Sequence, residues 1–289
     1  MNQVREEGPA LRTANPNDRI ALRGVRLTAR LSGMTQKTTI AQTFVNLERR
    51  AIEAVYTFPL PESAAVCGFE VITGDRFLTG QIEEAGQAVE KYEEAVSQGD
   101  GAFMLEQERP DVFTVRVGNL KPGQAATIRL TYVCPLERVD KSIRVAFPTT
   151  VAPRYVTATA TDPIDAAIDG DALNPPHVLH VPYGLTMDVE IDLGRKLRGV
   201  HSPSHAIRQE PADDSRSTAT RVTLAGGVTE MNRDVVLLID LHKEHEPSVQ
   251  VGKGPSGGDE GAYLAVTFVP EFDEADLVEP EPVETVFVL

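Results

Sequence analysis

Apolar and polar side chains alternate at every second position along much of this chain. In the first such run, Val25, Leu27, Ala29 and Leu31 are separated by arginine and threonine residues. A period of two is typical of a β-strand with one face buried and the other in solvent. Similar runs recur at 38–46, 55–58, 66–73, 103–106, 113–117, 127–132 and 143–147. Short strands at this spacing predict an antiparallel β-sandwich.

One segment of the first half has a different period, which predicts a helix from Gln81 to Gln98. Its apolar residues are three and four positions apart, and they are Ile82, Ala85, Val89, Tyr92 and Val96. That spacing places them on one face of a helix, which we expect to lie across a sheet. Glu83 and Glu84 would complement the helix dipole in the first turn, and Gly99 would end the helix.

The second half repeats the β pattern after a proline-containing stretch between 149 and 176, where we place a domain boundary. Further strands are predicted at 187–191, 222–224, 235–241 and 263–269, with a polar loop at 209–216 and a flexible joint at 252–261. The predicted fold class is therefore mainly β. It comprises an antiparallel β-sandwich with one short helix, followed by a second β-sandwich-like domain.

Composition and charge exclude two classes of partner. The 289 residues include 43 acidic and 28 basic side chains, which give a net charge of −15. This charge repels phosphate backbones and anionic membranes, so we expect neither nucleic-acid binding nor membrane insertion. The N-terminal residues lack the apolar run of a secretory signal, and no other run is long enough to span a bilayer. These features predict a soluble, cytoplasmic protein.

The two cysteines, Cys67 and Cys134, are too few for a disulfide framework. Both lie in predicted strands, where a thiol behaves as a small apolar group. We expect two free, buried thiols, and the alternative is a single bridge between them.

Candidate catalytic and metal-binding residues are sparse. His177 and His180 are three positions apart, and His201 and His205 flank Ser202-Pro203-Ser204. Neither histidine pair has a cysteine or a predicted helix that would complete a common zinc site, so no metal and no cofactor is expected. A serine hydrolase that uses Ser204 with His201 or His205 is the enzymatic alternative. No Gly-x-Ser-x-Gly elbow is present to bring the serine within reach of a histidine, which disfavours this alternative.

Several motifs in order resemble the vault protein inter-alpha-trypsin (VIT) domain. They are Val55–Pro61, Ala65–Glu70, Gly80-Gln81-Ile82, the helix residues Ala88, Tyr92 and Ala95, Asp111-Val112-Phe113, Val117–Gly123, Phe147-Pro148-Thr149 and Pro153-Arg154-Tyr155. The resemblance implies a β-sandwich over residues 19–155, preceded by a disordered tail at 1–18.

The following residues are similar to the second β-rich region of inter-alpha-trypsin inhibitor heavy chains and their bacterial relatives. The similarity rests on His201–His205, Leu224-Ala225 and Asn232–Leu237, and it implies a second domain at 156–270. It also implies that Ser202-Pro203-Ser204-His205 is a structural turn. In that family a von Willebrand factor type A domain follows. The resemblance therefore implies an acidic linker and the first strand of such a domain at 271–289, ending before the family's Asp-x-Ser-x-Ser metal motif.

The function implied by this resemblance is a non-enzymatic interaction or scaffolding module that presents an A-type domain, in cis, to protein partners. An extracellular matrix binder like the inhibitor heavy chains is the alternative. For Tyr56, Phe58 and Tyr92 two roles remain open. Their apolar periodicity favours core packing and a seat for the helix, whereas the alternative is an exposed patch for partner docking.

Overall fold

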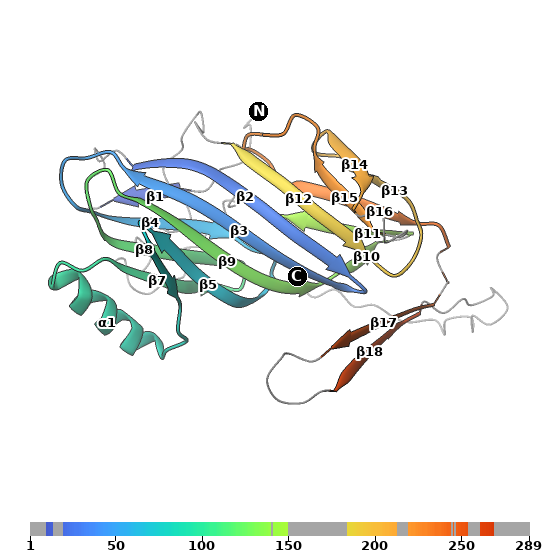
Figure 1. The fold of residues 1–289 in the computed structure, drawn as a ribbon, viewed down its shortest axis with the longest axis horizontal. Helices are drawn as coiled ribbons and strands as arrows, with labels where there is room; N and C mark the ends of the chain where they lie inside the picture. Colours follow the sequence, from blue (N-terminus) through green and yellow to red (C-terminus); the bar gives the residue numbers. More distant parts are fainter. Residues whose placement is uncertain are drawn as a thin grey trace, which may run out of the picture.

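The structure is a computed structural model that describes residues 10–13, 20–139, 141–149, 184–212, 219–243, 245, 247–253 and 261–268. These residues form a mainly β fold with one short helix, as predicted (Figure 1). The elements of the first half are β1 (Ala10–Thr13), β2 (Ile20–Ser32), β3 (Thr35–Asn46), β4 (Ile52–Pro59), β5 (Ala65–Thr73), β6 (Arg76–Thr79), α1 (Ala85–Ser97), β7 (Ala102–Arg109), β8 (Val112–Leu120), β9 (Ala125–Pro135), β10 (Glu137–Val139) and β11 (Ser142–Phe147). Those of the second half are β12 (Leu185–Asp192), β13 (Leu197–His201), β14 (Ile207–Pro211), β15 (Thr220–Leu224), β16 (Val235–Leu241), β17 (Ser248–Lys253) and β18 (Ala262–Thr267).

The strands form one large sheet, two smaller sheets and a hairpin. The large sheet has eight strands in the order β14-β15-β12-β2-β3-β9-β5-β6. The two four-stranded sheets have the orders β1-β4-β8-β7 and β10-β11-β16-β13, and β17 pairs with β18 alone. Figure 1 shows the smaller sheets side by side behind the large one, with the hairpin extending away from all three.

Strands from both halves of the chain share two of these sheets. In the large sheet, β12 runs parallel to β2, with Leu185 opposite Val25 and Asp192 opposite Ser32. In the smaller sheet, β11 pairs antiparallel with β16. The predicted domain boundary stays a prediction, because residues 150–183 lie outside the described part of the chain. The shared sheets nevertheless join the described strands on its two sides into one framework.

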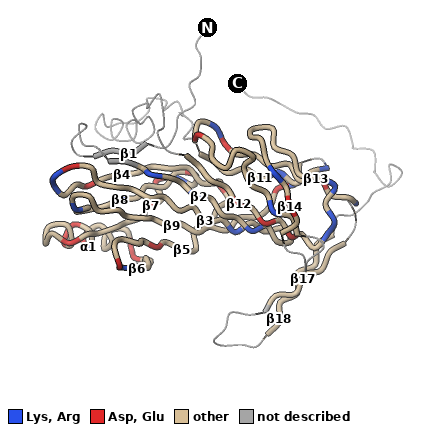
Figure 2. Tube along the Cα trace, turned by 45° about the horizontal axis from the view of Figure 1, so that its top comes forward, with Lys and Arg blue, Asp and Glu red and all other residues tan. Residues whose placement is uncertain are grey.

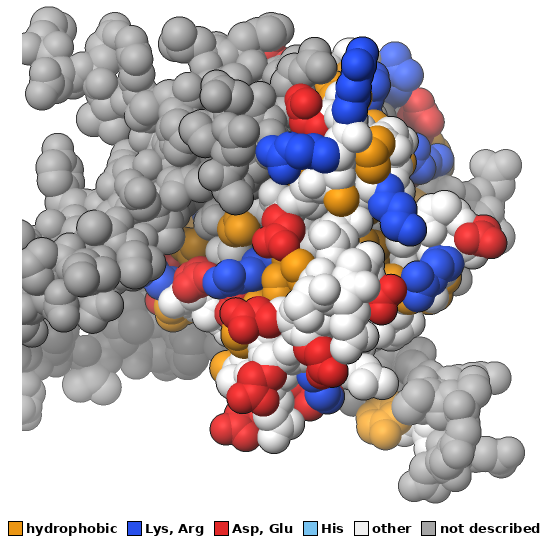
Figure 3. Space-filling model, turned by 90° about the vertical axis from the view of Figure 1, so that its left-hand side faces the viewer, with side chains coloured by type: hydrophobic (Ala, Val, Ile, Leu, Met, Phe, Trp, Pro, Cys, Tyr) orange, Lys and Arg blue, Asp and Glu red, His pale blue; other side chains and the backbone are white. Residues whose placement is uncertain are grey.

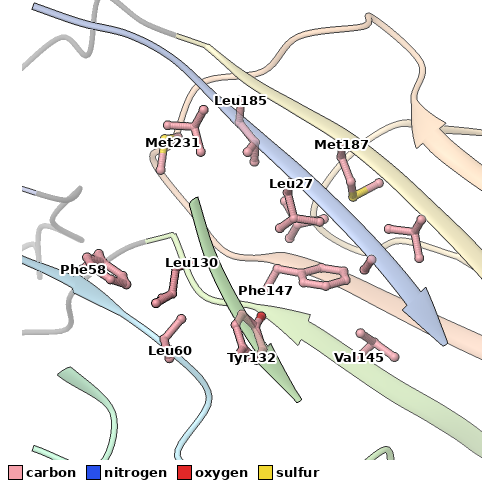
Figure 4. Close-up of a cluster of buried hydrophobic side chains, with 14 of the residues drawn as sticks. Leu27, Phe58, Leu60, Leu130, Tyr132, Val145, Phe147, Leu185, Met187 and Met231 are labelled. Carbon is pink, nitrogen blue, oxygen red and sulfur yellow. The ribbon is translucent and has the colours of Figure 1, made fainter. Parts of the chain in front are cut away.

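A single hydrophobic core lies between the large sheet and the smaller sheets. Figure 4 shows side chains of both layers pointing toward one another, including Leu27 and Leu130 from the large sheet and Phe58, Val145 and Phe147 from the smaller ones. All five are buried. Because β2, β9 and β12 each alternate apolar and polar residues, one face of the sheet supplies this core while the other meets solvent.

The inward face of β3 is unusually polar. Gln36, Thr38, Gln42 and Asn46 are all buried. Asn46 links the turn between β3 and β4 to the end of β8, because its Nδ2 donates to the carbonyl oxygens of Arg50 and Leu120 at 2.8 and 2.7 Å. Such buried polar groups are tolerated when hydrogen bonds replace the water that they lose.

Helix α1 is shorter than predicted, and it begins at Ala85 rather than Gln81. The residues before it are not helical, and Glu84 has the extended backbone angles φ −63° and ψ 138°. The placement of Ile82 on the apolar helix face was therefore wrong, and this side chain is fully exposed. Glu83 and Glu84 also lie outside the first turn, with Glu84 at the N-cap.

The predicted end of the helix is confirmed. Gly99 adopts a φ of 84°, and its N–H donates to the carbonyl oxygen of Val96 at 3.0 Å. Asn119 reinforces this end from the neighbouring strand, since its Nδ2 donates to the same Val96 oxygen at 2.7 Å. Gly118 lets the helix lie close to β8, because a Cβ there would be 2.4 Å from Val96 Cγ2.

Four other expectations differ from the structure, one of them because residues 252–253 of the predicted flexible joint belong to β17. Cys67 is exposed, not buried, because the pairing of β5 with β9 is irregular between Val66 and Gly68. Cys134 is buried as expected, and both thiols are free. Part of the predicted 209–216 loop belongs to the edge strand β14. Residues 10–13 of the segment expected to be a tail form β1, which pairs with β4.

Candidate functional site

The Ser202–His205 segment forms the turn between β13 and β14. The Ser202 Oγ accepts a hydrogen bond from the His205 N–H at 3.1 Å, and the Ser204 Oγ accepts one from the Val236 N–H at 2.9 Å. The Ser204 Oγ also lies 2.9 Å from His205 Nδ1. Ser204 thereby connects this turn to the start of β16, which agrees with the interpretation of the segment as a structural turn.

The distance between Ser204 and His205 is that of a nucleophile–base pair, but the other groups of a catalytic triad are not arranged around it. In a serine triad one imidazole nitrogen meets the serine and the other donates to a carboxylate. Here the Nε2 of His205 is buried and has no hydrogen-bond partner among the described residues. Burial lowers the pKa of His205, and the positive charge of Arg233 lowers it further. Both effects favour the neutral imidazole, and no group in the described residues orients it as a base.

The other histidines do not join this cluster. His201 is exposed, and its Nε2 lies 3.3 Å from the Asp240 carboxylate, while Ser142 donates to the second oxygen of Asp240 at 2.6 Å. His177 and His180 lie outside the described residues. In the described part of the chain, no three His, Cys, Asp or Glu side chains are grouped closely enough to hold a metal ion.

Two of the three candidate docking residues lie inside the sandwich. The rings of Phe44, Tyr56, Phe58 and Phe113 form a row, with neighbouring centroids 5.2, 5.5 and 6.3 Å apart. Tyr56 has an exposed fraction of 0%, and its hydroxyl accepts a hydrogen bond from Gln42 Nε2 at 2.8 Å. Tyr56 and Phe58 therefore fill the core in this structure, in keeping with their apolar periodicity.

Tyr92 has a different environment, at the edge of a recess of about 260 Å³ between α1 and the outer face of the β4-β8-β7 sheet. The recess is lined by Glu53, Val89, Tyr92, Glu93, Val96, Ser97, Met104 and Arg116. Partial burial, and then the charge of Glu53, raise the pKa of Tyr92 to about 12. Its hydroxyl therefore stays protonated and is able to donate a hydrogen bond at neutral pH.

The charges around this recess are unevenly paired. Arg116 Nε donates to the Glu106 carboxylate at 2.7 Å, whereas Glu53 and Glu93 have no ion pair in the described residues. The recess can therefore offer an aromatic ring, a hydroxyl and two carboxylates to a partner side chain. Glu53 and Arg116 lie in strands that precede and follow the helix, so no local sequence pattern indicated that they would meet Tyr92.

Figure 3 shows the side of the molecule on which α1 lies. Acidic side chains predominate in the lower part of the visible coloured surface and basic side chains in the upper part, with hydrophobic side chains scattered among them. This face has no broad apolar area among the residues drawn in colour. A partner that binds there would be recognised chiefly by polar groups around the recess.

A second recess, of about 370 Å³, lies on the solvent face of the large sheet. Its charges are largely paired across strands. Arg221 donates to both oxygens of Asp188, with its Nε at 2.8 Å, and Arg30 lies 3.7 Å from Glu190. Surface pairs of this kind contribute little stability, and they leave little net charge for a ligand. Figure 2 shows the same mixture of basic and acidic residues over the sheets.

The described framework is thus that of a β-sandwich protein with a polar recess and without an assembled catalytic constellation among the described residues. Residues 22–132 match the family model of the Vault protein inter-alpha-trypsin domain, which confirms the resemblance for that part of the chain. Within the described residues, no helix has the length and apolarity needed to cross a membrane.

Two groups of curated relatives match over most of this chain. Protein mono-ADP-ribosyltransferase PARP4 of Mus musculus is 30% identical over 90% of the chain, but the chain spans only 12% of that protein. Von Willebrand factor A domain-containing protein 5A of Homo sapiens is 30% identical over 88% of the chain, which spans 33% of it. The chain therefore spans at most about a third of these relatives, so their whole-protein activities are not transferred to it.

Among solved structures, an M1 zinc metallopeptidase from Deinococcus radiodurans aligns with 86% of this chain and 47% of its own, at 11% identity and a TM-score of 0.38. A likeness at this level carries no conclusion about function.

Proposed function

We propose that this chain is a non-enzymatic protein-interaction or scaffolding module that presents a following von Willebrand factor type A domain to protein partners. The observation that carries the proposal is the match to the VIT domain, together with relatives that are named for a von Willebrand factor A domain. The shared sheets support it further, because a framework with one continuous core is suited to hold a neighbouring domain in a fixed orientation.

The recess beside α1 is our proposed docking point for a protein partner. Tyr92 supplies a large ring with a hydroxyl, a residue type that is enriched where partners contribute binding energy. Glu53 and Glu93 leave the recess with negative charge, which favours a lysine or arginine side chain of the partner. Cation–π contact with Tyr92 would add to this attraction.

The proposal is tested by partner capture with charge reversals on α1. The full-length protein that contains these residues would be cross-linked to its partners, and the isolated 1–289 chain would be used as a competitor. We expect Glu93→Lys to weaken partner binding at least about fivefold, by the loss of complementary charge. Glu90→Lys is the matched control, because Glu90 lies on the same helix, is exposed and does not line the recess.

Two results would contradict the proposal. Equal partner binding by the Glu93→Lys and Glu90→Lys variants would remove the recess as the docking point. Turnover by the 1–289 chain would contradict the non-enzymatic role, and the residue to examine is Ser204. We expect no covalent labelling of Ser204 by a fluorophosphonate, and labelling that disappears in Ser204→Ala would establish the hydrolase alternative instead.

A further inference from the structure

The β17–β18 hairpin exposes an unusual concentration of large apolar side chains. Val249, Val251, Leu264 and Val266 each leave more than half of their surface in solvent. Val249 is paired with Val266 and Val251 with Leu264, so these four side chains lie on one face of the hairpin. Figure 2 shows the hairpin with hardly any charged residues. The four side chains therefore form one contiguous apolar surface that no described residue covers.

The opposite face of the hairpin is attached to the sandwich by polar contacts. Gln250 Nε2 donates to the carbonyl oxygen of Asp192 at 2.9 Å, and the Ser32 hydroxyl donates to Gln250 Oε1 at 3.2 Å. Arg195 Nη2 donates to the carbonyl oxygen of Thr267 at 3.0 Å. The Gln250 side chain sets which face is turned toward the body at this point, while Tyr263, farther along the same face, is 65% exposed.

Gln250 fits closely between two turns of the large sheet. Gly33 has a φ of 58°, and a Cβ at this position would lie 2.8 Å from Gln250 Oε1. Gly194 has a φ of 64° and also lies beside the Gln250 side chain. Since Gln250 and Val251 point to opposite faces of the strand, the attachment through Gln250 directs the Val249–Val251 face away from the sandwich.

The dimensions of this face decide what kind of partner can occupy it. Six residues per strand and two strands give a face of roughly 200 Å². Stable complexes between free proteins bury about 800 Å² on each partner. A partner that binds this face alone would therefore be held weakly. A domain joined to the hairpin by a short linker would bind here much more readily, because its effective concentration is in the millimolar range.

We propose that the outward face of β17–β18 is the docking site of the A-type domain itself. This inference rests on the proposed function, in which that domain follows this chain. Strand β18 leads directly into residues 269–289, which contain a strongly acidic segment at 271–284 and then the apolar residues Val286, Phe287, Val288 and Leu289. The linker thus begins at the hairpin, and the A-type domain offers an apolar surface that covers Val249, Val251, Leu264 and Val266.

Hydrogen exchange tests this inference in the full-length protein and in the 1–289 chain. We expect the amides of β17 and β18 to exchange at least about tenfold more slowly in the full-length protein, because docking suppresses opening of the hairpin. Val251→Asp should abolish this difference in the full-length protein. Val228→Asp is the matched control, since Val228 is similarly exposed and lies outside the hairpin.

Three outcomes would overturn the inference. Equal exchange in the two proteins would show that no following domain covers the hairpin. Protection that is already present in 1–289 and rises with protein concentration would identify a second copy as the occupant. Protection in 1–289 that is lost in 1–268 would identify the segment 269–289. If partner capture still depends on Glu93 while the hairpin exchanges equally, this inference fails and the proposed function stands.

Discussion

Strands β4 and β17 both alternate apolar and polar residues, yet the apolar faces of the two strands have opposite environments. Tyr56 in β4 is fully enclosed, whereas Val251 in β17 has an exposed fraction of 71%. Both strands are paired through backbone hydrogen bonds. The difference lies in the second layer, because the large sheet covers β4 and nothing in the described part of the chain covers the outward face of β17. Alternation of apolar and polar residues therefore indicates a strand, but it does not tell which part of the protein, or which partner, packs against the apolar face of that strand.

Replacement of Tyr56 should produce the largest difference between the two regions. Tyr56→Ala removes a ring that contacts Phe44 and Phe58, and we expect it to lower the free energy of unfolding by about 3–5 kcal/mol. Val251→Ala in the 1–289 chain should change it by less than about 0.5 kcal/mol. Urea unfolding measures both. Similar losses in the two variants would show that the hairpin face is already covered in the isolated chain.

An intermediate effect is expected at Gly118, where the helix meets β8. A methyl group at this position would overlap Val96 and approach the Tyr92 hydroxyl, so Gly118→Ala should destabilise the protein by about 1–3 kcal/mol. The double variant with Val96→Ala should recover part of this loss. A double-mutant cycle in urea checks the coupling. If the two substitutions change the free energy of unfolding additively, the contact between Gly118 and Val96 does not contribute to stability.

Loss of the Gln250 anchor should weaken the hairpin without changing the core. Gln250→Ala removes two hydrogen bonds to the turns of the large sheet, and we expect the local stability of β17 and β18 to fall by about 1 kcal/mol. Hydrogen exchange should accelerate in these two strands, while the urea midpoint stays the same. Faster exchange in β4 as well would indicate that the hairpin and the sandwich unfold together.

The smallest expected effect is a pH dependence that arises from His205. Its pKa is lowered in the folded protein, so the unfolded chain binds a proton more readily as the pH falls. The stability due to the neutral imidazole is complete above about pH 6.5, the usual pKa, and declines below that value. Unfolding free energies of the protein and of His205→Gln should therefore diverge between neutral and acidic pH. Parallel pH profiles would contradict the assignment.

Much of this fold could be predicted from local patterns. The runs at 25–31 and 128–132 alternate strictly, and both proved to be strands with one buried face. Gly99 ended the helix as its conformational freedom implied. The helix start was mispredicted because Ile82 continues the apolar helical spacing, although residues 81–84 are not helical in the structure. Cys67 was also mispredicted, because its exposure follows from the irregular pairing of two strands.

The candidate site was only partly accessible from the sequence. Tyr92 was singled out by its position on the helix, but the meeting of Glu53, Glu93 and Arg116 around it depends on tertiary packing. The sheets that combine strands from both halves of the chain could not be predicted from the sequence either. The pairing of Val25 with Leu185 joins residues 160 positions apart, and local periodicity carries no information about such partners. The proximity of Ser204 to His205 follows from the sequence, whereas the hydrogen bond from Val236 to Ser204 depends on tertiary structure.

The parallel pairing of β2 with β12 also affects how the chain folds during its synthesis on the ribosome. During synthesis β2 emerges long before β12, so one edge of the growing large sheet stays unpaired until residue 192 has left the ribosome. Pairing over such a sequence separation is slow to form, and an open strand edge invites association with other chains. A nascent chain that ends near residue 149 would therefore depend on chaperones more than the completed framework does.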